Sequence, residues 1–317
     1  MREAPHPGGG DARGDPDLSV VLGSLRLRNP VMTASGTFGY GPEYADLVDF
    51  EKLGAIVVKG ISLEPWGGNP PPRMVEVVGG LINAIGLQNP GVEGFLREYL
   101  PFLRGFATPI IVNIWGRTAE EYAAVARRLD GVEGVAALEI NVSCPNIKEG
   151  SKLFGTDLDA FRRVLEAVRA ATRLPLMPKL APNVSDIGAF ARAAEDGGAD
   201  AVSLINSVPA MAVDVETRRP RLANVTGGLT GPAIRPMAVK LVWEAARATR
   251  LPVVGMGGIS EAEHAAEFLI VGASAVAVGT ATFADPRAAV RVAEGLRGLL
   301  RRLGLASIRE LIGSLRP

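Results

Sequence analysis

The sequence contains one cysteine and two histidines among its 317 residues. A single cysteine cannot form an internal disulfide bond, which fits a reducing compartment, and we expect a cytoplasmic protein. These counts leave too few thiolate and imidazole ligands for a zinc site, so no metal centre is predicted. His6 lies near the N-terminus and His264 lies in the helical segment HAAEFL. Because neither falls at a predicted strand end, we expect the chemistry to use a side chain other than imidazole.

Net charge and long apolar runs are also lacking. The formal net charge is zero, so neither nucleic-acid binding nor attraction to an acidic membrane surface is indicated. No run reaches the ~18 apolar residues that a membrane-spanning helix needs. Residues 1–17 carry proline, glycine and charge without the apolar core of a signal peptide, and we expect a flexible tail there. The chain is 47% apolar, enough for a large core, and residues 18–317 are expected to form one domain.

Short apolar runs rich in valine, isoleucine and alanine alternate with longer segments of helical periodicity. This alternation is typical of parallel βαβ units. Segments 157–173 and 234–250 are predicted helices, and each ends in an arginine, a cation that stabilises the C-terminus of a helix. The eight predicted strands are 31–36, 55–60, 109–115, 137–143, 176–181, 201–206, 253–257 and 275–280.

Several segments between a strand and the next helix are long, whereas those between a helix and the next strand are short. The long segments are residues 61–88, 145–156 and 207–232. In an eight-stranded β/α barrel the loops after the strands build the site, while the loops before them only close turns. We therefore predict an α/β fold, a TIM (β/α)8 barrel with extended βα loops. A doubly wound sheet is the rival, but its turn G-x-G-x-x-G is missing after the first strand.

Polar side chains occur at predicted strand ends, where apolar ones are the default. Lys59 lies in VVKG and Lys179 in MPKL, although the chain has only six lysines against 28 arginines. A buried ammonium is costly unless it meets an anion or strong acceptors. Either lysine alone is as well explained by a side chain that reaches solvent at the rim. Together with four asparagines they favour an electron-rich ligand with amide-like edges; these are Asn83, Asn113, Asn141 and Asn206.

Small residues follow the last two predicted strands. VVGMGGIS contains Gly257 and Gly258, and AVAVGTATF contains Gly279 and Thr280. Loops at these two places commonly bind phosphate in such barrels, because small residues expose their backbone N–H groups. Relief of steric crowding is the alternative explanation of the glycines. We expect a phosphate-bearing cofactor.

Candidate bases at this edge are Cys144, Lys59, Lys179 and Glu139, of which Glu139 is expected to lie in the strand interior. A thiol has an ordinary pKa of about 8.5, which neighbouring cations lower, so it can accept a proton near neutrality. The alternative is a small buried apolar side chain, but Cys144 lies just after Asn141 and opens a long loop with Pro145. Because no histidine is placed to activate the thiol as an acyl nucleophile, a thiol base beside a bound cofactor is the preferred interpretation.

Eight motifs read, in order, NPVMTASGTFGYG, VVKG followed by GNPPPR, NAIGLQNPG, NVSCPN, PKLAPNV, GGLTGPAI, GMGGI and VGTA, within a match that runs from about residue 18 to 310. Together they resemble the class 1 dihydroorotate dehydrogenases. The cysteine in NVSCPN, in place of serine, is similar to the class 1 pattern. NAIGLQNPG resembles the motif of the catalytic subunit in the NAD-linked subclass, 1B. Ala181 stands where serine is frequent in the family, and Ser207 where threonine is common.

The resemblance implies an FMN-dependent barrel that oxidises dihydroorotate to orotate in pyrimidine biosynthesis. Cys144 would be the base that removes the C5 proton, while hydride passes from C6 to flavin N5. The resemblance implies substrate contacts from Lys59, Asn83, Ala84, Ile85, Gly86, Leu87, Asn141, Asn206 and Ser207. It implies FMN contacts from Ser35, Lys59, Gly60, Asn113, Asn141, Lys179, Ile205, Gly231, Gly257, Gly258, Gly279 and Thr280.

The resemblance also implies partners. A homodimer is expected, either alone or within a heterotetramer with an electron-transfer subunit that carries FAD and an iron-sulfur cluster and passes electrons to NAD. The chain itself has neither the cysteines for such a cluster nor a dinucleotide-binding motif. Two alternatives stay open: a flavin barrel like that of dihydropyrimidine dehydrogenase, and a non-redox TIM barrel that binds a phosphate-bearing ligand.

Overall fold

A barrel of eight parallel strands forms the centre of the protein. The computed structural model describes residues 14–142, 148–149 and 152–316, with the backbone alone for 148–149 and 152–153. The barrel strands are β3 (Val31–Thr33), β4 (Ile56–Ile61), β7 (Ile110–Ile114), β8 (Val135–Asn141), β11 (Leu176–Leu180), β12 (Val202–Leu204), β17 (Val253–Met256) and β18 (Ala275–Val278). Their hydrogen-bonded order is β3-β18-β17-β12-β11-β8-β7-β4. Each predicted strand segment overlaps one of them.

The ring is completed between β3 and β4. Gly54 N donates a hydrogen bond to Val31 O over 2.7 Å, and Met32 forms a parallel bridge with Ala55. The space beside Gly54 is filled by backbone, because an added Cβ would lie 2.1 Å from the carbonyl oxygen of Asn29. With this closure, consecutive barrel strands are neighbours all the way round, and the TIM barrel prediction is confirmed.

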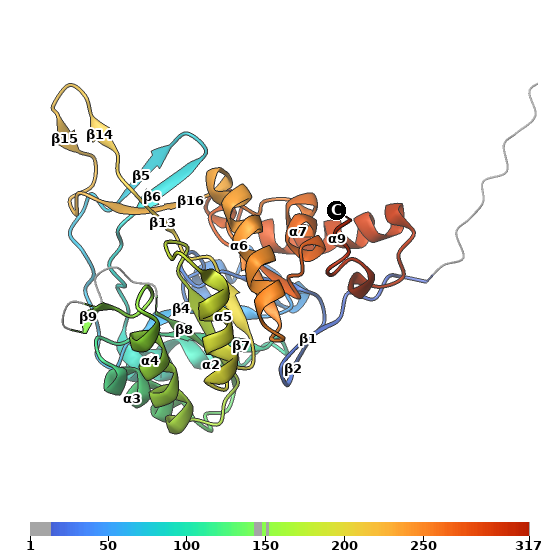
Figure 1. Ribbon diagram of the computed structural model, residues 1–317, viewed down its shortest axis with the longest axis horizontal. Coiled ribbons are helices and arrows are strands. Elements are labelled where there is room, and N and C mark those ends of the chain that lie inside the picture. The colour runs from blue at the N-terminus through green and yellow to red at the C-terminus, as the bar shows by residue number, and fades with distance from the viewer. Residues whose placement is uncertain (1–13, 143–147, 150–151, 317) are drawn as a thin grey trace, which may run out of the picture.

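Helices surround the barrel (Figure 1). They are α1 (Gly91–Gly94), α2 (Leu100–Leu103), α3 (Ala119–Leu129), α4 (Leu158–Ala171), α5 (Ile187–Asp196), α6 (Arg235–Ala248), α7 (Ala262–Ile270), α8 (Ala281–Ala284) and α9 (Ala288–Leu303). A π-helical turn, η3 (Phe95–Tyr99), joins α1 to α2, and short 3-10 turns occupy η1 (Pro42–Tyr44), η2 (Phe50–Lys52), η4 (Pro232–Ile234) and η5 (Ile308–Glu310). Both predicted helices are confirmed, as α4 and α6. Asp157 caps α4 by accepting a hydrogen bond from Ala160 N.

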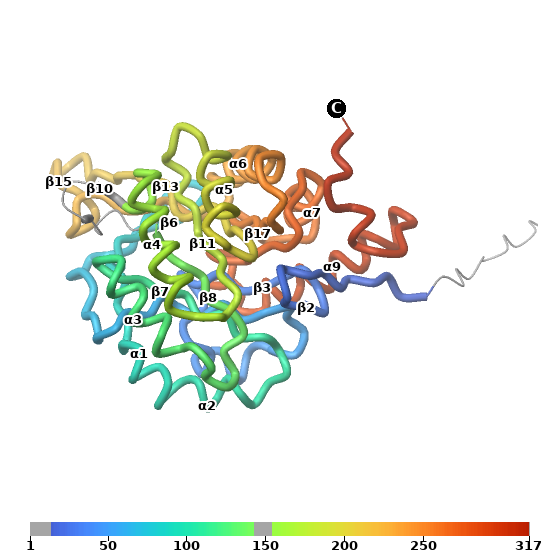
Figure 2. The backbone as a smooth tube through the Cα atoms, turned by 60° about the horizontal axis from the view of Figure 1, so that its bottom comes forward, coloured from blue at the N-terminus to red at the C-terminus, as the bar shows by residue number. Residues whose placement is uncertain are grey.

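A second sheet lies outside the barrel. It contains β5 (Met74–Val77), β6 (Gly80–Asn83), β13 (Val208–Ala210) and β16 (Gly227–Thr230), in the antiparallel order β13-β16-β6-β5. Three hairpins pair β1 (Val20–Leu22) with β2 (Leu25–Leu27), β9 (Lys148–Glu149) with β10 (Lys152–Leu153), and β14 (Val213–Asp214) with β15 (Arg219–Pro220). Since β4 and β12 lead into the second sheet, it stands at the carboxyl ends of the barrel strands, and Figures 1 and 2 show it projecting there with β15. The extended loops after the strands thus carry strands of their own.

Residues 14–17 are part of the folded protein, which differs from the expected tail. Asp15 forms ion pairs with Arg297 and Arg301 on α9. Asp17 N donates to Ala306 O over 2.9 Å, and Asp17 forms a parallel bridge with Ser307. The charges of Asp15 and Asp17 thus meet partners near the C-terminus, while the rest of the expected tail, residues 1–13, lies outside the described residues. Figure 2 shows the N-terminal segment running beside α9.

Candidate active site

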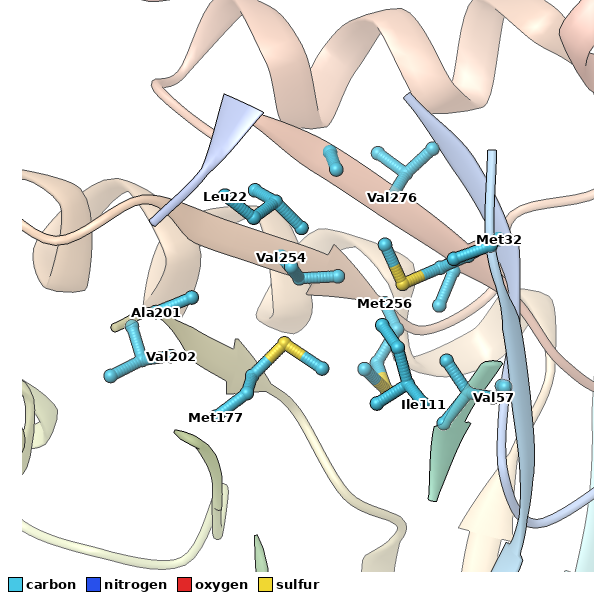
Figure 3. Packing of buried hydrophobic residues seen from close by; sticks show 14 of the residues in the cluster. Leu22, Met32, Val57, Ile111, Met177, Ala201, Val202, Val254, Met256 and Val276 are labelled. Carbon is cyan, nitrogen blue, oxygen red and sulfur yellow. The ribbon is translucent and has the colours of Figure 1, made fainter. Parts of the chain in front are cut away.

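The interior of the barrel changes from apolar to polar along the strands. Side chains two positions apart on a strand point to the same face. The apolar set includes Met32, Val57, Ile111, Met177 and Met256, which lie in one buried cluster (Figure 3). Two positions onward, Val57 is followed by Lys59, Ile111 by Asn113 and Met177 by Lys179. The polar residues thus form a layer above the apolar one, towards the carboxyl ends where barrel enzymes build their sites.

Glu139 on β8 is the centre of a buried polar cluster. Its side chain is only 1% exposed. The Oε1 atom accepts a hydrogen bond from Ser203 Oγ over 2.8 Å, and Oε2 accepts one from Asn113 Nδ2 over 2.5 Å. Lys179 Nζ lies 3.8 Å from the same Oε2 atom. A buried carboxylate is very costly unless it is paired and hydrogen-bonded, and here neighbouring strands supply both kinds of partner.

Lys179 on β11 is buried as well, with a side chain that is 7% exposed. Besides facing Glu139, its Nζ atom donates to Ser35 Oγ over 3.3 Å. Ser35 follows β3 and is itself buried. The lysine therefore lies inside the barrel rather than reaching solvent at the rim. Its hydrogen bond to Ser35 connects two expected cofactor residues, Lys179 and Ser35, across the interior.

Asn113 on β7 leaves one polar atom without a partner. Its Nδ2 group donates to Glu139, whereas its Oδ1 atom is buried with no hydrogen-bond partner in the described part of the chain. The Nε1 atom of Trp115 is also buried without a hydrogen-bond partner among the described residues. Both side chains lie against Gly60 on β4, where an added Cβ would be 2.7 Å from Asn113 Oδ1 and 3.3 Å from Trp115 Cδ1. A buried polar atom without a partner is rare, and such an atom is available to hydrogen-bond a ligand.

Asn141 and Asn206 are brought together at the ends of β8 and β12. Asn206 Nδ2 donates to Asn141 Oδ1 over 3.2 Å. Asn206 Oδ1 in turn accepts from the backbone N–H of Ser207 over 2.8 Å, which fixes the orientation of the amide. Ile205 beside it is buried, and the Leu204–Ile205 peptide bond is cis. Three expected site residues thus form one hydrogen-bonded chain.

Lys59 on β4 is half-buried and has no hydrogen-bond or ion-pair partner for its Nζ atom among the described residues. Burial lowers the pKa of Lys59 below its ordinary value, the positive charge of Arg73 lowers it further, and Glu43 partly offsets both. An ammonium held in this way gains from an incoming anion, because a carboxylate would compensate the lost solvation.

The second sheet delivers the expected substrate segment 83–87. Asn83 is the last residue of β6 rather than part of a loop, and its Nδ2 group donates to Gly228 O on β16 over 3.2 Å. Ser207 lies against the same strand, because a Cβ added at Gly228 would be 2.0 Å from Ser207 Oγ. Beyond Asn83 the chain turns through Gly86 and Leu87 with φ angles of 75° and 60°. Ala84, Ile85, Gly86 and Leu87 are all partly exposed.

The expected phosphate residues follow β17 and β18 directly. Gly257 and Gly258 have φ angles of 128° and 75°, a region that favours glycine. A Cβ at Gly258 would also lie 2.8 Å from the carbonyl oxygen of Gly231, so the two segments meet closely. Gly279 and Thr280 follow Val278, the last residue of β18, and are partly exposed. The structure therefore gathers these five residues on one side of the barrel opening.

Cys144 lies outside the described residues, as does part of the loop 145–156 in which it stands. The structure fixes the residues just before it: Asn141 is the last residue of β8, and Tyr122 Oη donates to its carbonyl oxygen over 2.7 Å. The role of Cys144 stays a prediction.

Two groups in the polar layer were missed in the sequence. Ser203, which donates to Glu139, was not identified, and neither was the hydrogen-bonding role of Glu139, although Glu139 lies in the strand interior as expected. Strand periodicity could have found Ser203, because it occupies the register position beside Lys179 on the neighbouring strand.

A hollow of about 600 Å³ lies elsewhere, between the segment that contains α1 and helix α3. It is lined by Leu63, Pro65, Pro90, Val92, Arg97 and Arg127, among others, and contains none of the predicted site residues. The convergence of buried polar groups, rather than this hollow, therefore locates the site. In the part of the chain that the structure describes, no helix is both long and apolar enough to cross a membrane.

The protein is a TIM barrel with eight parallel strands. Amide, hydroxyl and ammonium groups gather inside the carboxyl end of the barrel, an arrangement suited to a polar ligand. The chain belongs to the dihydroorotate dehydrogenase family, a family of oxidoreductases, because the family model described as "Dihydroorotate dehydrogenase" matches residues 17–300. The resemblance found in the motifs is thereby confirmed.

Curated relatives agree with the family model over nearly the whole chain. A protein of Geotalea uraniireducens is 55% identical over 302 residues, which are 95% of this chain and 99% of the relative. Proteins of Trichlorobacter lovleyi and Geobacter sulfurreducens are 56% and 55% identical over 300 residues, 95% of this chain and 99% and 98% of the relatives. All three are named "Dihydroorotate dehydrogenase B (NAD(+)), catalytic subunit".

Proposed function

We propose that the protein is the catalytic subunit of an NAD-linked dihydroorotate dehydrogenase and oxidises dihydroorotate to orotate in de novo pyrimidine biosynthesis. The observation that carries the proposal is the layer of amide, hydroxyl and ammonium groups inside the carboxyl end of the barrel. Dihydroorotate has amide-like edges and a carboxylate, which such groups bind well. The names of the relatives support the same activity.

The described residues fit FMN as the cofactor. The Oδ1 atom of Asn113 offers a buried acceptor without a partner among the described residues, and the lack of a side chain at Gly60 lets Asn113 approach that strand closely. We propose that Ser35, Asn113 and Lys179 hold the ring system, and that backbone groups of Gly231, Gly257, Gly258, Gly279 and Thr280 hold the phosphate. When bound, FMN supplies an acceptor, N5, for the hydride that leaves C6 of the substrate.

The chain's own residues would position the substrate and move its proton. The linked amides of Asn141 and Asn206, with Asn83 and Ser207, would hydrogen-bond the pyrimidine edges. Lys59 would pair with the carboxylate. Cys144, as the thiolate, would take the proton from C5 as hydride leaves C6, so that a carbon–carbon double bond forms and both hydrogens are accounted for.

We further propose that electrons leave through a partner subunit with FAD and an iron-sulfur cluster, and that two catalytic chains associate in a cytoplasmic assembly. The words "catalytic subunit" in the names of the relatives support a partner. The chain also has one cysteine, too few for a cluster of its own.

The purified chain, loaded with FMN, tests this function when it is mixed without oxygen with dihydroorotate and, separately, with dihydrouracil. We expect the visible absorbance of the oxidised flavin to disappear with dihydroorotate alone. NAD should then restore the absorbance only when the partner subunit is added. A protein that binds no flavin would be a non-redox barrel, and bleaching by dihydrouracil alone would identify a dihydropyrimidine-oxidising relative; fast reoxidation by fumarate would exclude the NAD-linked assignment.

A further inference from the structure

The buried carboxylate of Glu139 belongs to no step of the proposed reaction, yet it organises the polar layer. It lies on β8 between the two strands that carry Asn113 and Lys179. The register places Glu139 beside Asn113, and Lys179 beside Asn141, two positions further along β8. Lys179 therefore lies nearer to the carboxyl end, where the ligands are expected, and Glu139 lies one step deeper.

Glu139 fixes which atom Asn113 presents. An ionised carboxylate only accepts hydrogen bonds, so Asn113 must turn its Nδ2 group towards Oε2 of Glu139 and its Oδ1 atom away from it. That Oδ1 atom is the buried acceptor without a partner beside Gly60. A neutral amide at position 139 could donate as well as accept, and the orientation of Asn113 would no longer be determined.

Glu139 also compensates a charge. Its Oε2 atom lies 3.8 Å from Lys179 Nζ, and both side chains are at most 7% exposed. Charges so well shielded from water act on each other and on a bound ligand far more strongly than surface charges do. The pair places one positive and one negative charge in the polar layer, the positive one nearer to the opening.

The structure assigns Glu139 as a positioning residue that orients Asn113 and balances Lys179, and thereby sets the reduction potential and the retention of the flavin. This inference rests on the proposed function, because it assumes FMN beside Asn113 and Lys179. Two-electron-reduced flavin carries negative charge around N1 and O2. A negative charge at Glu139 therefore disfavours reduction, and the positive charge of Lys179 favours it.

The test compares midpoint potentials of the FMN-loaded protein, measured by equilibration with a reference dye, in Glu139→Gln, Lys179→Met and the double variant. We expect Glu139→Gln to raise the potential and Lys179→Met to lower it, each by about 30 mV or more, since that is a tenfold change in the reduced-to-oxidised ratio of a two-electron couple. The double variant should lie between them, near the wild type. Glu139→Gln should also lose FMN roughly tenfold more readily on dilution, because Asn113 is no longer oriented.

Glu244→Gln is the matched control, because Glu244 lies on α6 in an exposed pair with Lys240 and should leave the potential unchanged. If Glu139→Gln does not fold, the double variant compared with Lys179→Met measures the same charge, and the double variant should have the higher potential. Equal potentials in that comparison, or in Glu139→Gln and the wild type, overturn the inference. If the potentials are equal but dihydroorotate still reduces the wild-type protein, only the role of Glu139 is refuted. If the wild-type protein binds no FMN, the proposed function and this inference are both overturned.

Discussion

Gly60 lies directly against the amide of Asn113: a Cβ atom at position 60 would stand 2.7 Å from Asn113 Oδ1. The neighbouring Trp115 leaves no room on the other side, with Cδ1 at 3.3 Å from the same point. Position 60 is thus a place where glycine is required by close approach rather than by its backbone angles. The Oδ1 atom of Asn113 beside Gly60 has no hydrogen-bond partner among the described residues.

We expect Gly60→Ala to displace Asn113 and to weaken FMN binding. Overpacking at such a site costs about 1–3 kcal/mol of folding stability. Chemical denaturation and the flavin content of the purified protein measure the two effects.

Gly298→Ala is the control for this substitution. Gly298 lies in α9, and an added Cβ there meets no atom within 4 Å. This variant should be more stable than the wild type by about 0.5–1 kcal/mol and keep its flavin. A fully loaded Gly60→Ala protein with unchanged stability would contradict the account of this contact.

Lys59→Met should stabilise the protein at neutral pH while it impairs substrate binding. Burial lowers the pKa of Lys59, so the unfolded chain holds this proton more tightly than the folded one. The charged lysine therefore opposes folding at pH 7, and the penalty fades as the pH rises towards the ordinary lysine value of 10.5. The stability difference between the variant and the wild type should accordingly shrink between pH 7 and pH ~10, as denaturant unfolding at several pH values would reveal.

Lys59→Met should also weaken the binding of orotate. Loss of a charge-assisted hydrogen bond of about 1.5–3 kcal/mol should weaken binding by roughly ten- to a hundredfold. Lys240→Met, on an exposed face of α6, is the matched control and should show neither the gain in stability nor the loss of binding. Wild-type affinity for orotate in Lys59→Met would remove Lys59 from the substrate site.

Glu195 lies outside the candidate site, and its hydrogen bonds predict how the stability of the fold depends on pH. Hydrogen bonds from the Thr249 hydroxyl, and from the backbone and side chain of Arg250, lower the pKa of Glu195 to about 2. A carboxyl group whose pKa is lowered by folding stabilises the folded state above its ordinary pKa of 4.5, and this contribution is lost as the pH falls towards 2. We expect Glu195→Gln to be less stable than the wild type at pH 7 and the two stabilities to converge below pH ~4.5. A stability difference between the two proteins that stays constant as the pH falls through that range would contradict this prediction. The flavin of Glu195→Gln should be reduced at the wild-type rate.

The barrel could be predicted from the sequence because its signals are local. Each strand is a short apolar run, and the polar residues Lys59, Asn113 and Lys179 interrupt those runs two positions after an apolar interior residue. The second sheet was not predicted, since β6 pairs with β16 some 145 positions away, between Asn83 and Gly228, and no local pattern encodes that distance. The role of Glu139 was missed for the same reason. The function of this carboxylate depends on its contacts with side chains from three other strands, and its neighbours in the chain do not indicate those contacts.

The central claim is that Cys144, which follows Asn141 by three positions in the chain, acts as the base for a flavin-linked oxidation. The most direct measurement is the rate at which dihydroorotate bleaches bound FMN in Cys144→Ala after rapid anaerobic mixing at neutral pH. We predict that the variant keeps its flavin and binds orotate, but is reduced about a hundred to ten thousand times more slowly than the wild type, the usual loss when a general base is removed. Reduction at the wild-type rate would contradict the claim.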